Sequence, residues 1–147
     1  MICAFFGHRH TPVSVAPALR AVLWKLIACS HVDTFYVGTQ GQFVALVIHE
    51  LRTLQTEFPH IRCSIVLSVL PEPDSSPLPP GFDSIYPEGL ESVPRRFAID
   101  HRNRWMVSQS DVVIAYVTAP GGAAKFKALA ERKGKMVINL AKDTNFS

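Results

Sequence analysis

Short apolar runs alternate with segments of helical spacing along this chain. The apolar runs cover residues 2–6, 34–37, 62–70, 112–117 and 136–140, and the helical segments cover 13–28, 43–58, 95–109 and 123–135. Strands that alternate with helices form a parallel sheet with helices on both faces. We therefore predict an α/β fold, a three-layer, doubly wound, Rossmann-like parallel sheet of about five strands in one domain of residues 1–147.

The winding direction of such a sheet predicts where a ligand binds. Right-handed crossovers and one reversal of direction place the strands at 2–6 and 112–117 side by side at the centre. Ligands bind beyond the carboxyl ends of the strands at this reversal. Three turns should converge there, and each contains glycine: Gly7-His8-Arg9, Gly38-Thr39-Gln40-Gly41, and Thr118 to Ala123.

The stretch from Ser110 to Phe126 reads as a buried strand, the turn Pro120-Gly121-Gly122, and the start of a helix. Backbone N–H groups at such a turn and helix N-terminus carry partial positive charge and bind anions, most often phosphate. The alternative is an ordinary turn in which glycine serves only packing, because a short glycine motif is a weak signal. Lys125, one turn into the helix, faces either a phosphate or solvent.

Several polar side chains stand at these turns. Arg9 is predicted to grip a phosphate with its planar fork, although a surface arginine paired with a carboxylate is the alternative. His8 shares that strand end, as a loop histidine rather than a metal ligand. Thr39 and Gln40 hydrogen-bond a ribose or base edge, or serve the turn alone. Arg102 belongs to a cationic helix that is either beside the ligand or a solvated face.

Composition limits the partners. The formal net charge of +3 allows small anionic ligands but disfavours nucleic acid, which requires a concentrated basic face. Three widely spaced cysteines form neither a disulfide framework nor a metal pattern, which favours a reducing cytoplasm. The first six residues lack the features of a signal peptide, and we expect no membrane span. No metal, cofactor or catalytic constellation is indicated by the residue spacing.

Residues 71–94 hold seven of the eleven prolines and little periodicity. A loop this long in a compact domain is functional or disordered, so we interpret it as a cover over the site, with a mobile insertion as the alternative. Phe82, Ile85, Tyr86 and Leu90 could dock it. A polar tail follows at 141–147.

Nearly the whole chain resembles the SLOG superfamily, Rossmann-like domains that include the Lonely-guy phosphoribohydrolases and the DNA-processing protein A family. The resemblance is carried by Phe6-Gly7-His8-Arg9, Phe35-Tyr36-Val37-Gly38, Arg102-Asn103-Arg104-Trp105-Met106, Ser110-Asp111, Gly121-Gly122 and Ala130-Glu131-Arg132-Lys133-Gly134-Lys135. It is greatest to small stand-alone members from bacteria and phages. It implies a nucleotide-derived ligand at the glycine turn, in some members an immune signalling nucleotide, and a homo-oligomer paired through helices.

The resemblance to the Lonely-guy enzymes includes the start of their glycine motif but not its catalytic glutamate. Arg102 stands nine residues before Asp111, as in those enzymes, and Pro120-Gly121-Gly122 matches the start of their P-G-G-x-G-T-x-x-E motif. Ala124 and Lys125 replace the second glycine and the threonine, and Ala128 occupies the position of the catalytic glutamate. We therefore expect binding of a nucleotide, ADP-ribose-like or cyclic nucleotide ligand, as sensor, carrier or sponge, without a resident cofactor.

Two other functions stay open at this point. A nucleotide N-glycosidase would need a replacement acid, for which Glu88 or Glu91 of the proline-rich loop is the candidate. A nucleic-acid-binding protein, as among the DNA-processing relatives, is the second alternative, and the modest net charge argues against it.

Overall fold

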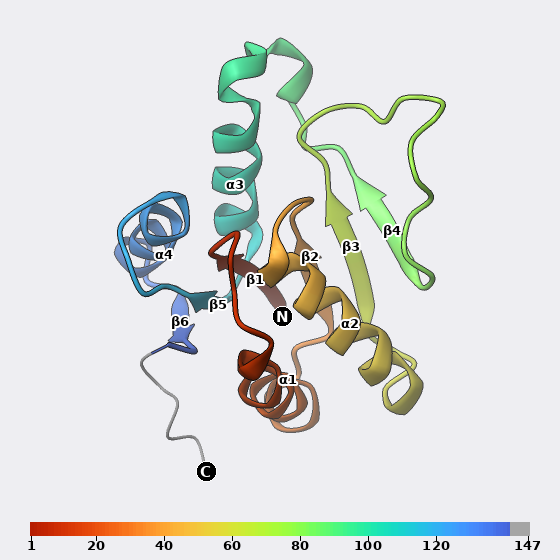
Figure 1. Cartoon of the computed structure of the whole chain (residues 1–147), viewed down its shortest axis with the longest axis vertical. Helices are drawn as coiled ribbons and strands as arrows, with labels where there is room; N and C mark the ends of the chain where they lie inside the picture. The colour runs from red at the N-terminus through yellow and green to blue at the C-terminus, as the bar shows by residue number, and fades with distance from the viewer. Residues whose placement is uncertain (142–147) are drawn as a thin grey trace.

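The structure, a computed structural model that describes residues 1–141, is an α/β fold with a parallel sheet between two layers of helices (Figure 1). The strands within these residues are β1 (Ile2–Gly7), β2 (Thr34–Val37), β3 (Arg62–Val66), β4 (Phe82–Ile85), β5 (Val112–Tyr116) and β6 (Met136–Asn139). The helices are α1 (Ala16–Ser30), α2 (Gln42–Glu57), α3 (Ala98–Gln109) and α4 (Gly122–Arg132), with 3-10 turns at Val13–Val15, Leu90–Ser92 and Arg95–Phe97. Beyond Ala141, the predicted polar tail lies outside the described residues.

The strand order β4-β3-β2-β1-β5-β6 confirms the doubly wound, Rossmann-like topology. Every pair of neighbouring strands is parallel. As the sequence predicted, β1 and β5 are adjacent at the point where the winding reverses, with Cys3 opposite Val112 and Gly7 opposite Tyr116. The carboxyl ends of β1, β2 and β5 therefore reach the same edge of the sheet.

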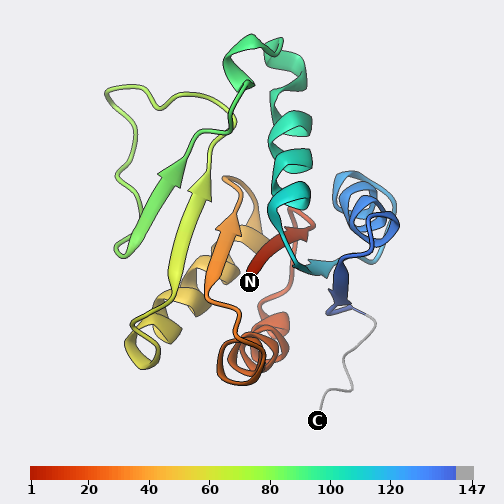
Figure 2. The ribbon, with the colours of Figure 1, turned by 180° about the vertical axis from the view of Figure 1, so that it is seen from behind.

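The central strands are apolar on both sides because both faces are covered. Cys3 and Phe5 of β1 belong to the core beneath α1 and α2, whereas Ala4 and Phe6 belong to the core beneath α3 and α4. Successive side chains of a strand point to opposite faces, so a strand buried on both faces reads as a continuous apolar run. Figures 1 and 2 show the two helical layers on opposite sides of the sheet.

The sheet has six strands within the described residues, one more than predicted, because the proline-rich segment contains β4. Phe82 of β4 pairs with Cys63 of β3 and is buried, whereas Asp83 and Ser84 are exposed. A four-residue edge strand with polar, exposed residues between prolines carries little of the alternation that identifies a strand. Leu90 is also buried, as expected of a residue that docks this segment.

One segment bears on the expectation of no membrane span. Within residues 1–141, Val13–Ser30 is long and apolar enough to cross a membrane by length and composition. This finding is weak by itself, because a core helix passes the same test. The inward residues Leu19, Leu23 and Ile27 of this segment pack in the core against the sheet.

Candidate functional site

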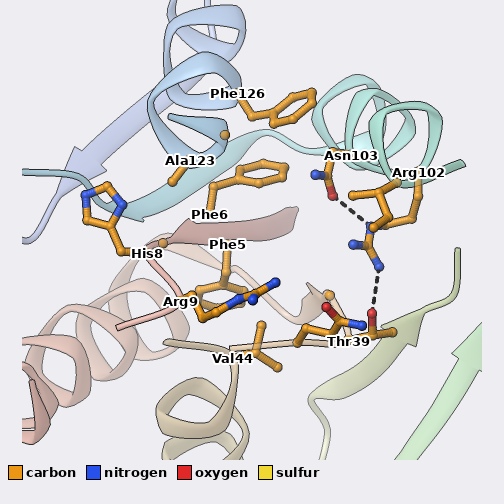
Figure 3. A pocket seen from close by; sticks show the side chains of 15 residues that line it. Phe5, Phe6, His8, Arg9, Thr39, Val44, Arg102, Asn103, Ala123 and Phe126 are labelled. Carbon is orange, nitrogen blue, oxygen red and sulfur yellow. Dashed lines mark hydrogen bonds between the residues drawn. The ribbon is translucent and has the colours of Figure 1, made fainter. Parts of the chain in front are cut away.

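A cavity of about 360 Å³ lies where the carboxyl ends of β1, β2 and β5 meet the first turns of α2, α3 and α4 (Figure 3). Its lining comes from all three predicted turns and from those helices: Phe5, Phe6, Gly7, His8, Arg9, Gly38, Thr39, Gln40, Val44, Ile99, Arg102, Asn103, Gly122, Ala123 and Phe126. The structure thus brings together most of the residues that the sequence singled out. A cavity of this volume suits a small organic ligand.

Close packing at Gly7 draws the first turn of α2 against the end of β1. A Cβ atom on Gly7 would lie 2.8 Å from the Cβ of Phe43 and closer still to its buried ring. Gly41, with φ of 104°, begins α2 in a conformation that favours glycine, and the N–H of Gln42 donates a 2.8 Å hydrogen bond to the carbonyl of Arg9. The first two glycine turns are therefore held together by backbone contacts.

His8 joins the first turn to the turn after β5. The ring Nε2 of His8 accepts a 2.8 Å hydrogen bond from the backbone N–H of Thr118, and the backbone N–H of His8 donates to the carbonyl of Tyr116 at 3.3 Å. The ring also packs edge-on against Tyr116, with centroids 6.0 Å apart. The acceptor role of Nε2 fixes the orientation of the ring between the two turns.

The N-terminus of α4 opens into the cavity through Gly122 and Ala123. Gly121, with φ of 146°, turns the chain into this helix, and its carbonyl accepts from the N–H of Lys125 at 3.0 Å. The N–H groups in the first turn of a helix have no partner within the helix. Within residues 1–141 no acceptor faces the N–H groups of Gly122 and Ala123. These donors, at the positive end of the helix dipole, favour an anion.

Arg102 forms the opposite wall of the cavity, and its side chain is buried at 6% exposure. Nη1 donates to the carbonyl of Val66 at 2.9 Å and to Oγ1 of Thr39 at 3.3 Å, while Nε donates to Oδ1 of Asn103 at 2.7 Å. No carboxylate among the described residues pairs with this guanidinium. Burial lowers its pKa to about 10. A buried cation held only by neutral acceptors is poised for an anionic ligand.

Charge in the cavity has one sign. Its lining contains Arg9 and Arg102 but no aspartate or glutamate. Arg9 is otherwise exposed, and Figure 3 shows its guanidinium extending into the cavity beside Val44 and Thr39. The two arginines therefore give the cavity a positive electrostatic potential, which attracts a small anion.

Four of the predicted site residues do not line the cavity: Thr118, Pro120, Gly121 and Lys125. Thr118 and Gly121 instead shape the turn through the contacts described above. Lys125 forms an ion pair with Asp100 of α3, so its charge is neutralised within the protein. Asp100 also pairs with Arg104, whereas Arg96 stacks on the ring of Phe97.

Replacement of Asp100 with asparagine should lower the free energy of unfolding by about 0.2–1 kcal/mol, because the ion pairs with Lys125 and Arg104 are partly exposed. Lys125 and then Arg104 hold the pKa of Asp100 below its usual range. The carboxylate therefore stabilises the fold at neutral pH, and this contribution is lost as the pH falls through that lowered pKa. Urea unfolding at pH 7 and in acid measures the difference, and an effect equal at both values would contradict it.

Six lining residues were missed by the sequence analysis as site residues: Phe5, Phe6, Val44, Ile99, Asn103 and Phe126. In the sequence the phenylalanines look like ordinary core residues, and they are buried in the core in the structure as well. They line the cavity because its inner wall is formed by the core. Asn103 had a usable signal, since a polar residue directly after an arginine expected at the site could share its environment. Ile99, which is 52% exposed, stands at the first turn of α3.

The proline-rich segment and its acids lie away from the cavity. No residue of 71–94 lines it, so the interpretation of this segment as a cover over the site is wrong for this structure. Glu88 lies beside His101 and Arg104 on the outer side of α3, and Glu91 lines a separate groove with Arg95. Neither glutamate is therefore placed to act as the replacement acid of a glycosidase.

Comparison with family models and curated sequences does not assign this chain to a family. No protein-family model matches the chain, and no curated protein sequence matches it either. The assignment of a function therefore rests on the residues of the cavity.

Proposed function

We propose that this protein binds a nucleotide or nucleotide-derived ligand, such as an ADP-ribose-like molecule or a cyclic nucleotide, as a sensor, carrier or sponge. One observation carries the proposal. The free N–H groups of α4 and the buried guanidinium of Arg102 face one cavity whose lining contains no carboxylate. Such a site compensates negative charge that water would otherwise solvate.

The ligand is proposed to enter with a phosphate against Gly122 and Ala123, where the helix dipole and Arg9 neutralise its charge. Thr39 and Gln40 would contact the ribose or the base. Val44 and Phe6 supply apolar walls between the polar groups. The resemblance to the SLOG superfamily, whose members bind nucleotides at the corresponding turn, supports this orientation. Membership of that superfamily, a role in phage or bacterial immunity, and a homo-oligomer belong to the same proposal.

Binding is favoured over hydrolysis because the cavity lining supplies no carboxylate for acid catalysis. The small net charge of +3 favours a small anion over a nucleic acid. A cytoplasmic location is part of the proposal, because three unpaired cysteines suit a reducing compartment.

Thermal unfolding in the presence of AMP, ADP-ribose and cyclic dinucleotides tests the proposal. At a concentration about 100-fold above its Kd, a ligand should raise the Tm by about 5 °C or more, because it binds only the folded state. Adenosine, which lacks phosphate, is the control and should shift the Tm little. Absence of a shift with every member of the panel, for protein that is folded by circular dichroism, would contradict nucleotide binding.

Chromatography of the same mixtures separates binding from turnover. Intact ligand is expected after incubation. Released base or ribose phosphate, lost when Glu88 or Glu91 is replaced with glutamine, would support the glycosidase instead.

A further inference from the structure

Both ends of the cavity present hydrogen-bond donors, and this limits which ligands fit it. We infer that the ligand carries two separate anionic groups, one at the N-terminus of α4 and one at Arg102, as in a nucleoside bisphosphate or a cyclic dinucleotide rather than a nucleoside monophosphate. The inference rests on the proposed function and deepens it. It depends on which atoms at each end are already engaged.

At the first end the protein offers donors. The N–H groups of Gly122 and Ala123 have no acceptor among the described residues, and the neighbouring carbonyl of Gly121 is engaged by Lys125. The turn is held from outside by His8, whose Nε2 is occupied by Thr118. A phosphate oxygen satisfies two adjacent N–H groups, whereas a ribose hydroxyl would satisfy them poorly.

At the second end Arg102 already occupies the side-chain acceptors nearest to it. Oδ1 of Asn103 accepts from Nε, and the two N–H bonds of the Asn103 amide are free to donate to a ligand. Oγ1 of Thr39 accepts from Nη1, which leaves the hydroxyl hydrogen free to donate. Nη2 of Arg102 has no hydrogen-bond partner among the described residues. Every buried polar side-chain atom of these residues has a partner, so Nη2 is not buried and is accessible from the cavity. The principal free groups at this end are therefore donors as well.

One phosphate cannot serve both ends. Figure 3 shows Ala123 and Arg102 on opposite sides of the cavity, with Phe6 and Phe126 along the wall between them. A nucleoside monophosphate on the α4 turn would present hydroxyl or amino groups to Arg102. The buried guanidinium would then stay uncompensated, because no carboxylate of the described protein pairs with it. A second anionic group removes that cost.

Isothermal titration of the full chain with AMP, adenosine 3′,5′-bisphosphate, adenosine 2′,5′-bisphosphate and cyclic di-AMP tests the inference. At least one compound with two separate anionic groups should bind about tenfold or more tightly than AMP, since a charge-assisted hydrogen bond contributes that much. AMP binding with no gain for any compound that has two separate anionic groups would overturn the inference while leaving the proposed function standing. No binding by any compound would overturn both.

Asn103→Asp is the decisive variant. Its carboxylate can still accept from Nε of Arg102, so the fold should keep its Tm, but it removes the amide donors and neutralises the guanidinium. Affinity for the compound with two separate anionic groups should fall about tenfold or more, and affinity for AMP should change much less. Gln109→Glu, at the exposed end of the same helix, makes the same amide-to-carboxylate change and should leave both affinities nearly unaltered. Equal losses for AMP and for the compound with two separate anionic groups in Asn103→Asp would contradict a second anion site.

Discussion

Replacement of Arg102 with methionine is expected to lower nucleotide affinity about 10- to 150-fold, because a charge-assisted hydrogen bond to the ligand contributes about 1.5–3 kcal/mol. The same change should alter the free energy of unfolding by less than about 1 kcal/mol, since it removes a desolvated charge along with the hydrogen bonds to Val66, Thr39 and Asn103. Calorimetric titration measures the affinity and urea unfolding measures the stability.

Arg104→Met is the matched control for this variant. Arg104 lies on the same helix, is exposed, pairs with Asp100 and does not line the cavity. Its replacement should leave nucleotide affinity within about twofold, because an exposed charge acts on the ligand only through screened solvent. Equal affinities of the wild type and Arg102→Met, or equal losses in the two variants, would show that the buried guanidinium does not hold the ligand.

Gly7→Ala is expected to have the largest effect on stability. The added methyl group would collide with the ring of Phe43, which belongs to α2 and is buried in the core against β1. Overpacking of this kind costs about 1–3 kcal/mol, and the contact atoms here belong to a buried core side chain rather than to the flexible end of a surface one. Urea unfolding should show this loss, with a fall in Tm of about 4–10 °C.

Gly38→Ala provides the comparison at the neighbouring turn. A Cβ atom there would lie 3.7 Å from the guanidinium of Arg102, an ordinary van der Waals contact. This variant should therefore fold with a stability within about 1 kcal/mol of the wild type. If the two alanine variants were equally stable, the account of Gly7 as a close-packing position would be wrong.

The central sheet could be predicted because its strands are buried on both faces. Residues 2–6 and 112–117 are apolar throughout, and helices follow each of them, which leaves little freedom in topology. The edge strand β4 could not be predicted in the same way, since only Phe82 is buried among its four residues. Its pairing with β3 depends on tertiary contacts that leave no periodic pattern.

The location of the cavity was predictable for a related reason. Once β1 and β5 are adjacent, the turns that contain Gly7, Gly38 and Gly122 must meet, and they do. The partners of individual side chains were not predictable. Lys125 faces Asp100 instead of the cavity, because α3 and α4 pack side by side and bring these charges together. That contact depends on the relative position of two helices, which the spacing along the chain does not encode.

The most direct test of the account is amide NMR of the isotopically labelled protein, titrated with the nucleotide that raises the Tm most. We predict that the largest shifts occur at Gly7 to Arg9, at Gly38 to Gln40, and at the Gly122 and Ala123 amides, which should move downfield as they bond a phosphate. Shifts that gather instead at residues 68–75 and 86–98, where the separate groove lies, would contradict a site at the carboxyl ends of β1, β2 and β5.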